Sequence, residues 1–374
     1  MKPLKLCLCM IVKNESHIIL ETLDSIKPYL DYWVICDTGS IDKTPELIEE
    51  FFKKEGIKGE LHRVEWKNFG YNRTQVFKLA FGKADYLWVI DADDYLVGSL
   101  DIDNLNADSY RLKYVLGSIT YYRDQLFKAN LEWEYRGVLH EYPYCLSKEQ
   151  HSRGLIEGNY YIQARTLGAR SKLDQKTKYL ADARILEDAL LEEQDPGLLA
   201  RYLFYLAQSY RDADENEKAI YWYQKRVDAN GWVEEVWYSK YQIGRLYELL
   251  GNIEKAKSAY LEAFEYRPVR AESLYSLGKL CNVKREFAQA YLYLNYAAKI
   301  PYTQDILFVS KSVYDYEIDF ELSISAYWVG DYRQSVALCD KLIAMKNSIH
   351  PSIYEQTLKN RTFGAAKLTN SNSA

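Results

Sequence analysis

Three acidic residues follow an apolar run in the first third of the sequence, and their spacing suits metal and phosphate chemistry. Asp91, Asp93 and Asp94 come directly after Tyr86–Ile90, a run of apolar and aromatic residues. Such a run predicts a buried strand whose carboxyl end delivers the acids to the rim of a sheet. On an extended backbone Asp91 and Asp93, two apart, point the same way. Mg²⁺ or Mn²⁺, bound by one or two carboxylates and by substrate phosphates, would relieve their repulsion.

The same acids are compatible with a plain polar turn or a helix cap. Two other predicted strands favour a site, because they also end in polar residues, at 13–15 and at 37–40. Polar ends of three parallel strands meet at one edge of a sheet and form a pocket there. The sequence has no Walker-type loop and no G-x-G-x-x-G. We therefore expect phosphate to be bound through a metal and a basic residue, for which Arg73 is the candidate; the alternative is a solvated arginine on a helix face.

Strand-like and helix-like segments alternate through the first quarter of the chain. This alternation predicts a parallel sheet with helices on both faces. Thr44 is expected to cap a helix that has Pro45 at its first position. The expected strands are 4–12, 32–37, 59–65 and 85–90, and the expected helices are 15–26, 44–54 and 71–81.

Three segments in this region, Cys9–Glu15, Asp37–Asp42 and Asp91–Asp94, together resemble the leading motifs of family 2 glycosyltransferases with the GT-A fold. The resemblance covers residues 4–145 and keeps the family's motif order. It implies an α/β domain over residues 1–173, with a Rossmann-like, mixed and mostly parallel sheet. It also implies metal-dependent, inverting sugar transfer that uses Mn²⁺ or Mg²⁺. A UDP-sugar is the favoured donor, with GDP-mannose as the second choice.

The resemblance assigns roles to individual residues. In the family the acid after the second strand contacts the nucleotide base, which places Asp37 there, with Gly39 and Ser40 beside it. The end of the first strand contacts the nucleoside, which places Asn14 and Glu15 nearby. The D-x-D acids address the ribose and the metal, so Asp91 and Asp93 are the expected acidic ligands, with Asp91 toward the sugar.

A histidine and a glutamate further along complete the expected site. GT-A enzymes commonly take a late histidine as a third metal ligand, which makes His140 the candidate on an expected strand; the alternative is a histidine satisfied within the sheet edge. An inverting transfer also needs a carboxylate to accept the acceptor's proton. Glu141 and Asp94 are the candidates and Asp124 ranks third. The acidic pair that the family usually has at the start of a late helix is not evident, so the base stays open.

The second half of the chain is expected to be helical and repetitive. Ala219, Ala256 and Ala290 lie 37 and then 34 residues apart, and each is followed four residues later by an aromatic or leucine residue. This period is the tetratricopeptide pattern, which predicts a solenoid over residues 174–346 with a concave face. Residues 347–374 are expected to form a helix or tail, disordered from 369.

The aromatic residues of the repeats admit two interpretations. They line a groove for a glycan or protein acceptor, or for a protein partner, or they are core residues between helices. Two segments, 231–237 and 270–275, place charges beside aromatic residues where a repeat needs none. Basic residues at the junction either reach a pyrophosphate or belong to a solvated linker. They are Arg165, Arg170 and Lys172.

Composition narrows the class of protein. The net charge of −5 gives no general attraction to nucleic acid or anionic membrane. The six cysteines have no CxxC spacing, which favours a reducing compartment and predicts a cytoplasmic protein, peripheral to a membrane at most through a partner. No apolar stretch is long enough to cross a membrane, and 6–12 is expected to be a strand and not a signal peptide.

Two rival functions remain from the sequence. One is a degenerate transferase domain that serves a tetratricopeptide scaffold. The other is a different metal-dependent phosphate enzyme, either a nucleotidyltransferase or an aspartyl-phosphate phosphatase. The acids here follow three strand–helix units, whereas the phosphatase usually has them early in the chain, and this difference favours the transferase.

Overall fold

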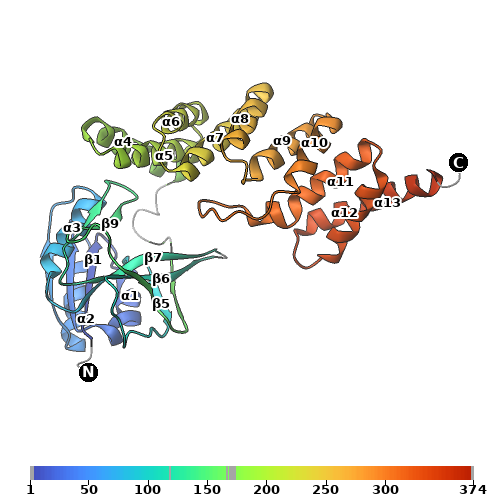
Figure 1. Cartoon of the computed structure of the whole chain (residues 1–374). Helices are drawn as coiled ribbons and strands as arrows, with labels where there is room; N and C mark the ends of the chain where they lie inside the picture. The colour runs from blue at the N-terminus through green and yellow to red at the C-terminus, as the bar shows by residue number, and fades with distance from the viewer. Residues whose placement is uncertain (1–3, 118, 166, 168–173, 372–374) are drawn as a thin grey trace. The chain divides into compact units, whose positions relative to one another are not determined.

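The computed structural model describes residues 4–117, 119–165, 167 and 174–371 (Figure 1). The chain divides into two compact units, Met1–Tyr205 and Leu206–Ala374. None of the helices among the described residues has the length and apolar content needed to cross a lipid bilayer.

The first unit is built on a nine-stranded mixed sheet whose parallel half consists of the predicted strands. These four strands lie in the order β3-β2-β1-β4 and all run parallel. Their carboxyl ends therefore lie at one edge of the sheet, with the end of β1 between those of β2 and β4. The strands are β1 (Leu6–Val12), β2 (Tyr32–Asp37), β3 (Lys58–Arg63) and β4 (Tyr86–Val89).

The other half of the sheet joins β4 through an antiparallel strand, β7, so the sheet is mixed as the resemblance implied. The order continues β4-β7-β6-β11-β5, with β10 beside β6, while β8 and β9 form a separate antiparallel pair. These strands are β5 (Tyr95–Gly98), β6 (Ser109–Leu116), β7 (Ile119–Lys128), β8 (Trp133–Arg136), β9 (Tyr142–Cys145), β10 (Arg153–Leu155) and β11 (Tyr160–Gln163).

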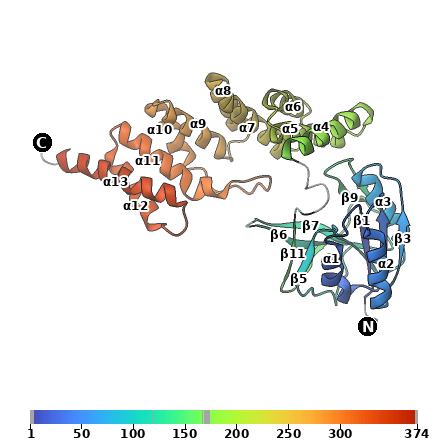
Figure 2. The same ribbon diagram turned by 180° about the vertical axis from the view of Figure 1, so that it is seen from behind.

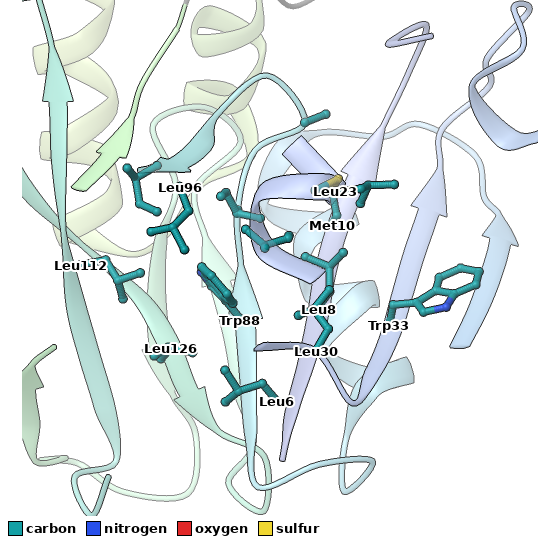
Figure 3. Close-up of a cluster of buried hydrophobic side chains, with 14 of the residues drawn as sticks. Leu6, Leu8, Met10, Leu23, Leu30, Trp33, Trp88, Leu96, Leu112 and Leu126 are labelled. Carbon is teal, nitrogen blue, oxygen red and sulfur yellow. The ribbon is translucent and has the colours of Figure 1, made fainter. Parts of the chain in front are cut away.

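Helices cover both faces of the sheet, as the alternation predicted. Side chains of a strand alternate between faces, so Leu8 packs in one core cluster with α1 and α2, while Cys9 packs in another with α3. Figure 3 shows Leu6, Leu8 and Met10 of β1 on the first of these faces with Leu23 of α1, and Figure 2 shows the helices from behind. The helices are α1 (Ile19–Ile26), η1 (Lys27–Tyr29), α2 (Thr44–Glu55) and α3 (Phe69–Ala80).

Helices follow from Gln175 onward, in antiparallel pairs with the predicted repeat. The small residues lie where paired helices touch: a Cβ on Gly244 would lie 2.6 Å from the Tyr260 ring, and one on Gly278 would lie 2.4 Å from Leu294. The helices are α4 (Gln175–Glu192), α5 (Pro196–Asp212), α6 (Asn216–Asp228), α7 (Val233–Leu249), α8 (Ile253–Tyr266), α9 (Glu272–Val283), α10 (Phe287–Ala297), η3 (Val313–Glu317), α11 (Ile318–Trp328), α12 (Tyr332–Ala344) and α13 (Pro351–Ser371).

The boundaries differ in detail from the predicted ones. The strands end at Gln163 and the helices begin at Gln175, on either side of the predicted boundary at 173, yet the first compact unit continues to Tyr205 within α5. At the other end, α13 extends to Ser371, beyond the predicted start of a disordered tail.

Candidate active site

The ends of β1 and β2 form one side of the site. Asn14, in the left-handed backbone conformation (φ 58°), donates its N–H to Ser40 Oγ at 2.9 Å and accepts the N–H of Ile41 on its amide oxygen at 2.8 Å. Both carboxylate oxygens of the buried Asp37 accept the N–H of Ser40, at 3.1 and 3.2 Å. The structure thus brings Asn14, Asp37 and Ser40 together as predicted.

A cavity of about 520 Å³ adjoins these residues. Its lining includes Asp37, Gly39 and Ser40 from the predicted set. It also includes Arg63 at the end of β3, which sequence reasoning missed. The parallel β2–β3 register places Arg63 beside Asp37. A basic residue near the end of the third predicted strand was the sequence signal that could have identified Arg63 as part of the site.

Glu15 and Thr44 fix the loop that carries this side of the site. The N–H of Glu15 donates to Thr44 Oγ at 2.8 Å. Thr44 is the first residue of α2 and not its cap, because its own N–H and hydroxyl donate to Asp42 at 3.0 and 2.6 Å. Burial raises the pKa of Asp42, but the donors from Ser16 and Thr44 outweigh it and lower the pKa to about 2.

The acids after β4 lie in a turn, which contradicts the predicted extended backbone. β4 ends at Val89, and the N–H of Asp94 donates to the carbonyl of Asp91 at 3.1 Å. Asp91 and Asp93 therefore face different partners: Asp91 meets two arginines, while the Asp93 carboxylate accepts the N–H of Leu167 at 3.3 Å. The prediction that both carboxylates share a face was wrong, because a turn breaks the two-residue alternation of a strand.

Asp91 lies at the centre of an arginine–carboxylate cluster. Arg73, only 8% exposed, donates Nη2 to Asp91 Oδ1 at 2.5 Å and Nε to Glu141 Oε1 at 2.7 Å. Arg123 donates to the other oxygen of Asp91 at 3.1 Å. Burial raises the pKa of Asp91, but the two arginines outweigh it and hold the pKa well below its usual range. Burial lowers the pKa of Arg73, but Asp91 and Glu141 raise it well above its ordinary value.

Arg123 was missed by sequence reasoning because it lies in no motif. β7 pairs antiparallel with β4, and the register joins Trp88 to Leu126. Continued for three residues past Trp88, that register brings Asp91 opposite Arg123. Only the sheet topology, with β7 next to β4, identifies this residue.

His140 and Glu141 lie in the loop between β8 and β9 and not on a strand as predicted. His140 has a left-handed backbone (φ 54°), and its ring stacks on Tyr205 with the ring centroids 3.8 Å apart. Its carbonyl accepts two bonds from Arg201, at 3.0 and 2.7 Å. The side chain of Glu141 instead accepts a hydrogen bond from Arg73 and so belongs to the arginine–carboxylate cluster. The loop separates the two side chains, as strand alternation would also have done.

The predicted metal ligands do not form a ligand set. Asp91 is bound by two arginines, the Asp93 carboxylate accepts the N–H of Leu167, and the ring of His140 lies flat on Tyr205. Among the described residues there is no group of three or more His, Cys, Asp or Glu side chains that could hold a metal ion. A metal at Asp91 would first have to displace Arg73 and Arg123. This arrangement does not fit Mn²⁺ or Mg²⁺ at these three residues.

The candidate bases differ in burial and in access. A cavity of about 850 Å³ is lined by Arg73, Asp91, Arg123, Asp124 and Glu141, among others. Asp94 is 3% exposed and accepts the N–H of Arg165 at 3.2 Å. Burial, with the nearby Asp91, raises the pKa of Asp94 to about 8. Burial also raises the pKa of Asp124, which pairs with Arg153 at 3.1 Å.

Arg165 is held beside the D-x-D turn. Its Nε donates to the carbonyl of Asp93 at 2.6 Å, and its Nη1 to Glu21 at 2.6 Å. Arg165 therefore braces the turn instead of lying in a solvated linker. Arg170 and Lys172, the other two basic residues of the junction, lie outside the described residues.

Comparison with known proteins finds a family model and relatives that match parts of this chain. Residues 7–175 match the family model described as glycosyl transferase family 2. A TPR repeat-containing protein of Synechococcus elongatus is 35% identical over 91 residues, which are 24% of this chain and 21% of that protein. The SPbeta prophage-derived glycosyltransferase SunS of Bacillus subtilis is 24% identical over 232 residues, 58% of this chain and 52% of the relative. The chain thus spans about half or less of these relatives.

Two solved structures show weaker likeness. The TarS structure from S. aureus, in complex with UDP-GlcNAc, is 14% identical with a TM-score of 0.37 over 71% of this chain and 92% of that one. A tetratricopeptide repeat protein from Parabacteroides merdae is 16% identical with a TM-score of 0.38 over 53% of this chain and 74% of that one. Scores of this size carry no argument. The family model is the stronger finding: residues 7–175 form a domain that matches glycosyl transferase family 2.

Proposed function

We propose that this chain is a glycosyltransferase that moves a sugar from a nucleotide-sugar to a hydroxyl group of a glycan or protein acceptor, with a UDP-sugar as the favoured donor. One observation carries the proposal: the polar ends of β1, β2 and β4 meet at one edge of the sheet. The cavity beside Asp37 suits the base, and the cluster of Arg73, Asp91 and Arg123 suits the ribose and diphosphate. Ligands of open α/β sheets bind at such an edge.

The proposed reaction is a direct, inverting displacement. The acceptor oxygen attacks the anomeric carbon, its proton passes to a carboxylate, and the nucleoside diphosphate leaves. Glu141 is the proposed base because it lines the larger cavity. Asp94 is the alternative, but with a pKa of about 8 it is mostly protonated at neutral pH. No step uses a metal, because the side chains do not fit one.

We also propose the cellular compartment in which the enzyme works. All six cysteines are buried free thiols, which suits a reducing compartment, and we propose the cytoplasm.

Release of UDP from a panel of UDP-sugars, with simple glycosides and peptides as acceptors, tests the reaction. Glu141→Gln should lower kcat by roughly 10² to 10⁴ fold, the usual contribution of a general base. It should leave UDP binding within about threefold of wild type, because the base contacts the acceptor and not the nucleotide. The exposed Glu149→Gln is the matched control and should keep full activity. Unchanged turnover in Glu141→Gln would remove Glu141 from this role.

A second candidate function is a catalytically degenerate domain that serves the repeats. The observation in its favour is that both oxygens of Asp91 are bound by arginines. This candidate predicts neither sugar transfer nor nucleotide binding, so a titration with UDP separates the two.

A further inference from the structure

The loop between β8 and β9, which carries Glu141, has a strained backbone. His140 adopts a left-handed conformation (φ 54°), and so does Gly137 (φ 104°) three residues earlier. Glycine adopts this conformation at little cost, but a histidine keeps it only where the surrounding structure holds it there. Because Glu141 follows His140 directly, the contacts that hold His140 also set the direction in which the side chain of Glu141 leaves the loop.

Helix α5 holds His140 at both its carbonyl and its ring. Arg201 donates its Nε and Nη2 to the His140 carbonyl, at 3.0 and 2.7 Å. One turn further along the helix, the ring of Tyr205 stacks on the His140 ring, with the centroids 3.8 Å apart and an angle of 10° between the planes. The guanidinium of Arg201 lies 5.0 Å from the centre of the Tyr205 ring. Two residues on one face of α5 therefore hold the left-handed residue.

A third contact from α5 holds the start of the loop. The N–H of Val138 donates to the hydroxyl of Tyr202 at 3.1 Å, and Tyr202 is only 2% exposed. The loop also meets α3, because a Cβ on Gly70 would lie 2.2 Å from the carbonyl oxygen of Gly137. The chain just before Glu141 is thus held by α5 as well as by α3.

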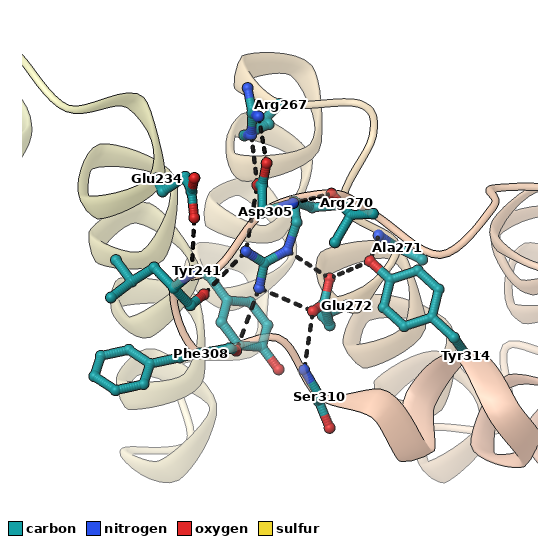
Figure 4. A network of polar contacts seen from close by, with 12 residues as sticks. Glu234, Tyr241, Arg267, Arg270, Ala271, Glu272, Asp305, Phe308, Ser310 and Tyr314 are labelled. Atoms are coloured by element: carbon teal, nitrogen blue, oxygen red, sulfur yellow. Dashed lines mark hydrogen bonds and ion pairs between the residues drawn. The ribbon is translucent and has the colours of Figure 1, made fainter. Parts of the chain in front are cut away.

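The second unit uses an arginine in the same way (Figure 4). Phe308, in the non-helical stretch before η3, is another left-handed residue (φ 48°), and its carbonyl accepts Nη2 of Arg270 at 3.3 Å. The Phe308 ring packs on Tyr238 with the centroids 4.8 Å apart. Arg270 is fully buried and lies 3.8 Å from the centre of the Trp237 ring. This contact accounts for a charge beside aromatic residues in segment 270–275, and it repeats the arrangement of arginine, left-handed residue and ring stack.

Helices α4 and α5 also form part of the wall of the cavity that Glu141 lines. The residues of these helices on the wall include Lys178, Tyr179, Arg201 and Tyr205. The match to the family model ends at residue 175, so both helices contribute residues that lie beyond it. The tetratricopeptide pattern assigned them to the repeats, yet their contacts complete the cavity of the proposed base.

We propose that Arg201 and Tyr202 are positioning residues for sugar transfer, which act through Glu141 by holding the loop before it. This inference rests on the proposed function, in which Glu141 takes the proton of the acceptor hydroxyl. Proton transfer needs the carboxylate within about 2.6–3.2 Å of that hydroxyl. A loop released from α5 lets His140 leave its left-handed conformation, and this change redirects the side chain of Glu141. The cavity beside Asp37, proposed for the nucleotide base, contains no residue of this loop.

Steady-state kinetics of UDP release by the full chain tests this role. Arg201→Met keeps a long side chain but removes both donors, so it should lower kcat by about 10-fold to 100-fold, the cost of a small misplacement near the reacting groups. Tyr202→Phe removes only a hydroxyl group and should lower kcat by about threefold or more.

A calorimetric titration with UDP separates positioning from loss of folded protein. The affinity for UDP and the number of sites per chain should stay within about twofold of wild type in both variants, because the base contacts the acceptor and not the nucleotide. A protein that had merely lost part of its fold would bind less UDP per chain. Arg184→Met, at an exposed arginine on α4, is the matched control and should equal wild type in kcat and in UDP binding.

Two further measurements show whether the residues act through the loop and through Glu141. In a Glu141→Gln background, neither Arg201→Met nor Tyr202→Phe should lower the residual turnover further, because the base that they position is already absent. Amide hydrogen exchange of residues 137–141, read by mass spectrometry, requires no activity. It should become about tenfold faster or more in both variants and stay unchanged in Arg184→Met.

Failure of this inference is distinguishable from failure of the proposed function. An inactive wild-type protein, or normal turnover in Glu141→Gln, would overturn the proposed function. If those two behave as proposed, three results would overturn the positioning role alone. They are unchanged kcat in both Arg201→Met and Tyr202→Phe, equal losses of kcat with and without Glu141→Gln, and unchanged hydrogen exchange of residues 137–141.

Discussion

Replacing Arg73 with methionine should destabilise the first unit far more than the same replacement at Arg123. Arg73 is 8% exposed and neutralises two carboxylates, Asp91 and Glu141, whose side chains are 29% and 11% exposed. Arg123 is 37% exposed and shares only Asp91. Removing one partner of a buried ion pair costs roughly 3–5 kcal/mol, whereas an exposed pair contributes about 0–1 kcal/mol.

Calorimetric melting of the full-length protein measures the difference. A domain of this size loses about 2–4 °C per kcal/mol, so Arg73→Met should lower the transition of the first unit by roughly 6–20 °C. Arg123→Met should lower it by no more than about 4 °C. The transition of the second unit should not move in either variant. Equal shifts for the two variants would refute the view that Arg73 is the buried centre of the cluster.

Two other changes test the packing and the electrostatics of the site. Gly70→Ala should cost about 1–3 kcal/mol in unfolding free energy, because the new Cβ would lie 2.2 Å from the carbonyl oxygen of Gly137 in the loop that carries Glu141. Gly197→Ala is the control in the same denaturant titration and should be nearly neutral, because Gly197 is exposed at the start of α5 and its new Cβ would meet only the Asp195 side chain, at 3.1 Å. Asp94, with a pKa of about 8, stabilises the fold while it is protonated, so its contribution is present at low pH and lost as pH rises toward 8. Asp94→Asn should therefore show a smaller fall in melting temperature between pH 5 and 9 than wild type, and parallel curves would contradict the raised pKa.

Local sequence signals predicted the strands and helices of the first unit as far as β4, but not the strands β5–β11. The predicted bounds of β2 agree with the structure at both ends. The apolar, β-rich run is bounded by the polar residues Asp31 and Thr38, which leave little choice of where the strand begins and ends. The helix α1 begins at Ile19, four residues later than expected, since Glu15 and Ser16 are held by bonds to Thr44 and Asp42 across the loop. Such long-range bonds to side chains are not visible in the local sequence.

The site was predicted in its members but not in its geometry. Asn14, Asp37 and Ser40 came together because parallel strands end at one edge. Asp91 and Asp93 separated because the chain turns directly after Val89, and propensity alone does not decide between a turn and one more extended residue. Arg123 comes from a strand 32 residues further along, paired in a register that only the sheet reveals.

The measurement that tests the central claim most directly is a calorimetric titration of UDP into the full-length protein, with GDP for comparison. The account predicts saturable binding of UDP, weakened about tenfold or more, which is about 1.4 kcal/mol, in Asp37→Ala. Asp103→Ala, an exposed acid away from the rim, should bind as wild type. If neither nucleotide binds, or if Asp37→Ala binds UDP as tightly as wild type, the nucleotide-sugar site at the ends of β1, β2 and β4 is wrong.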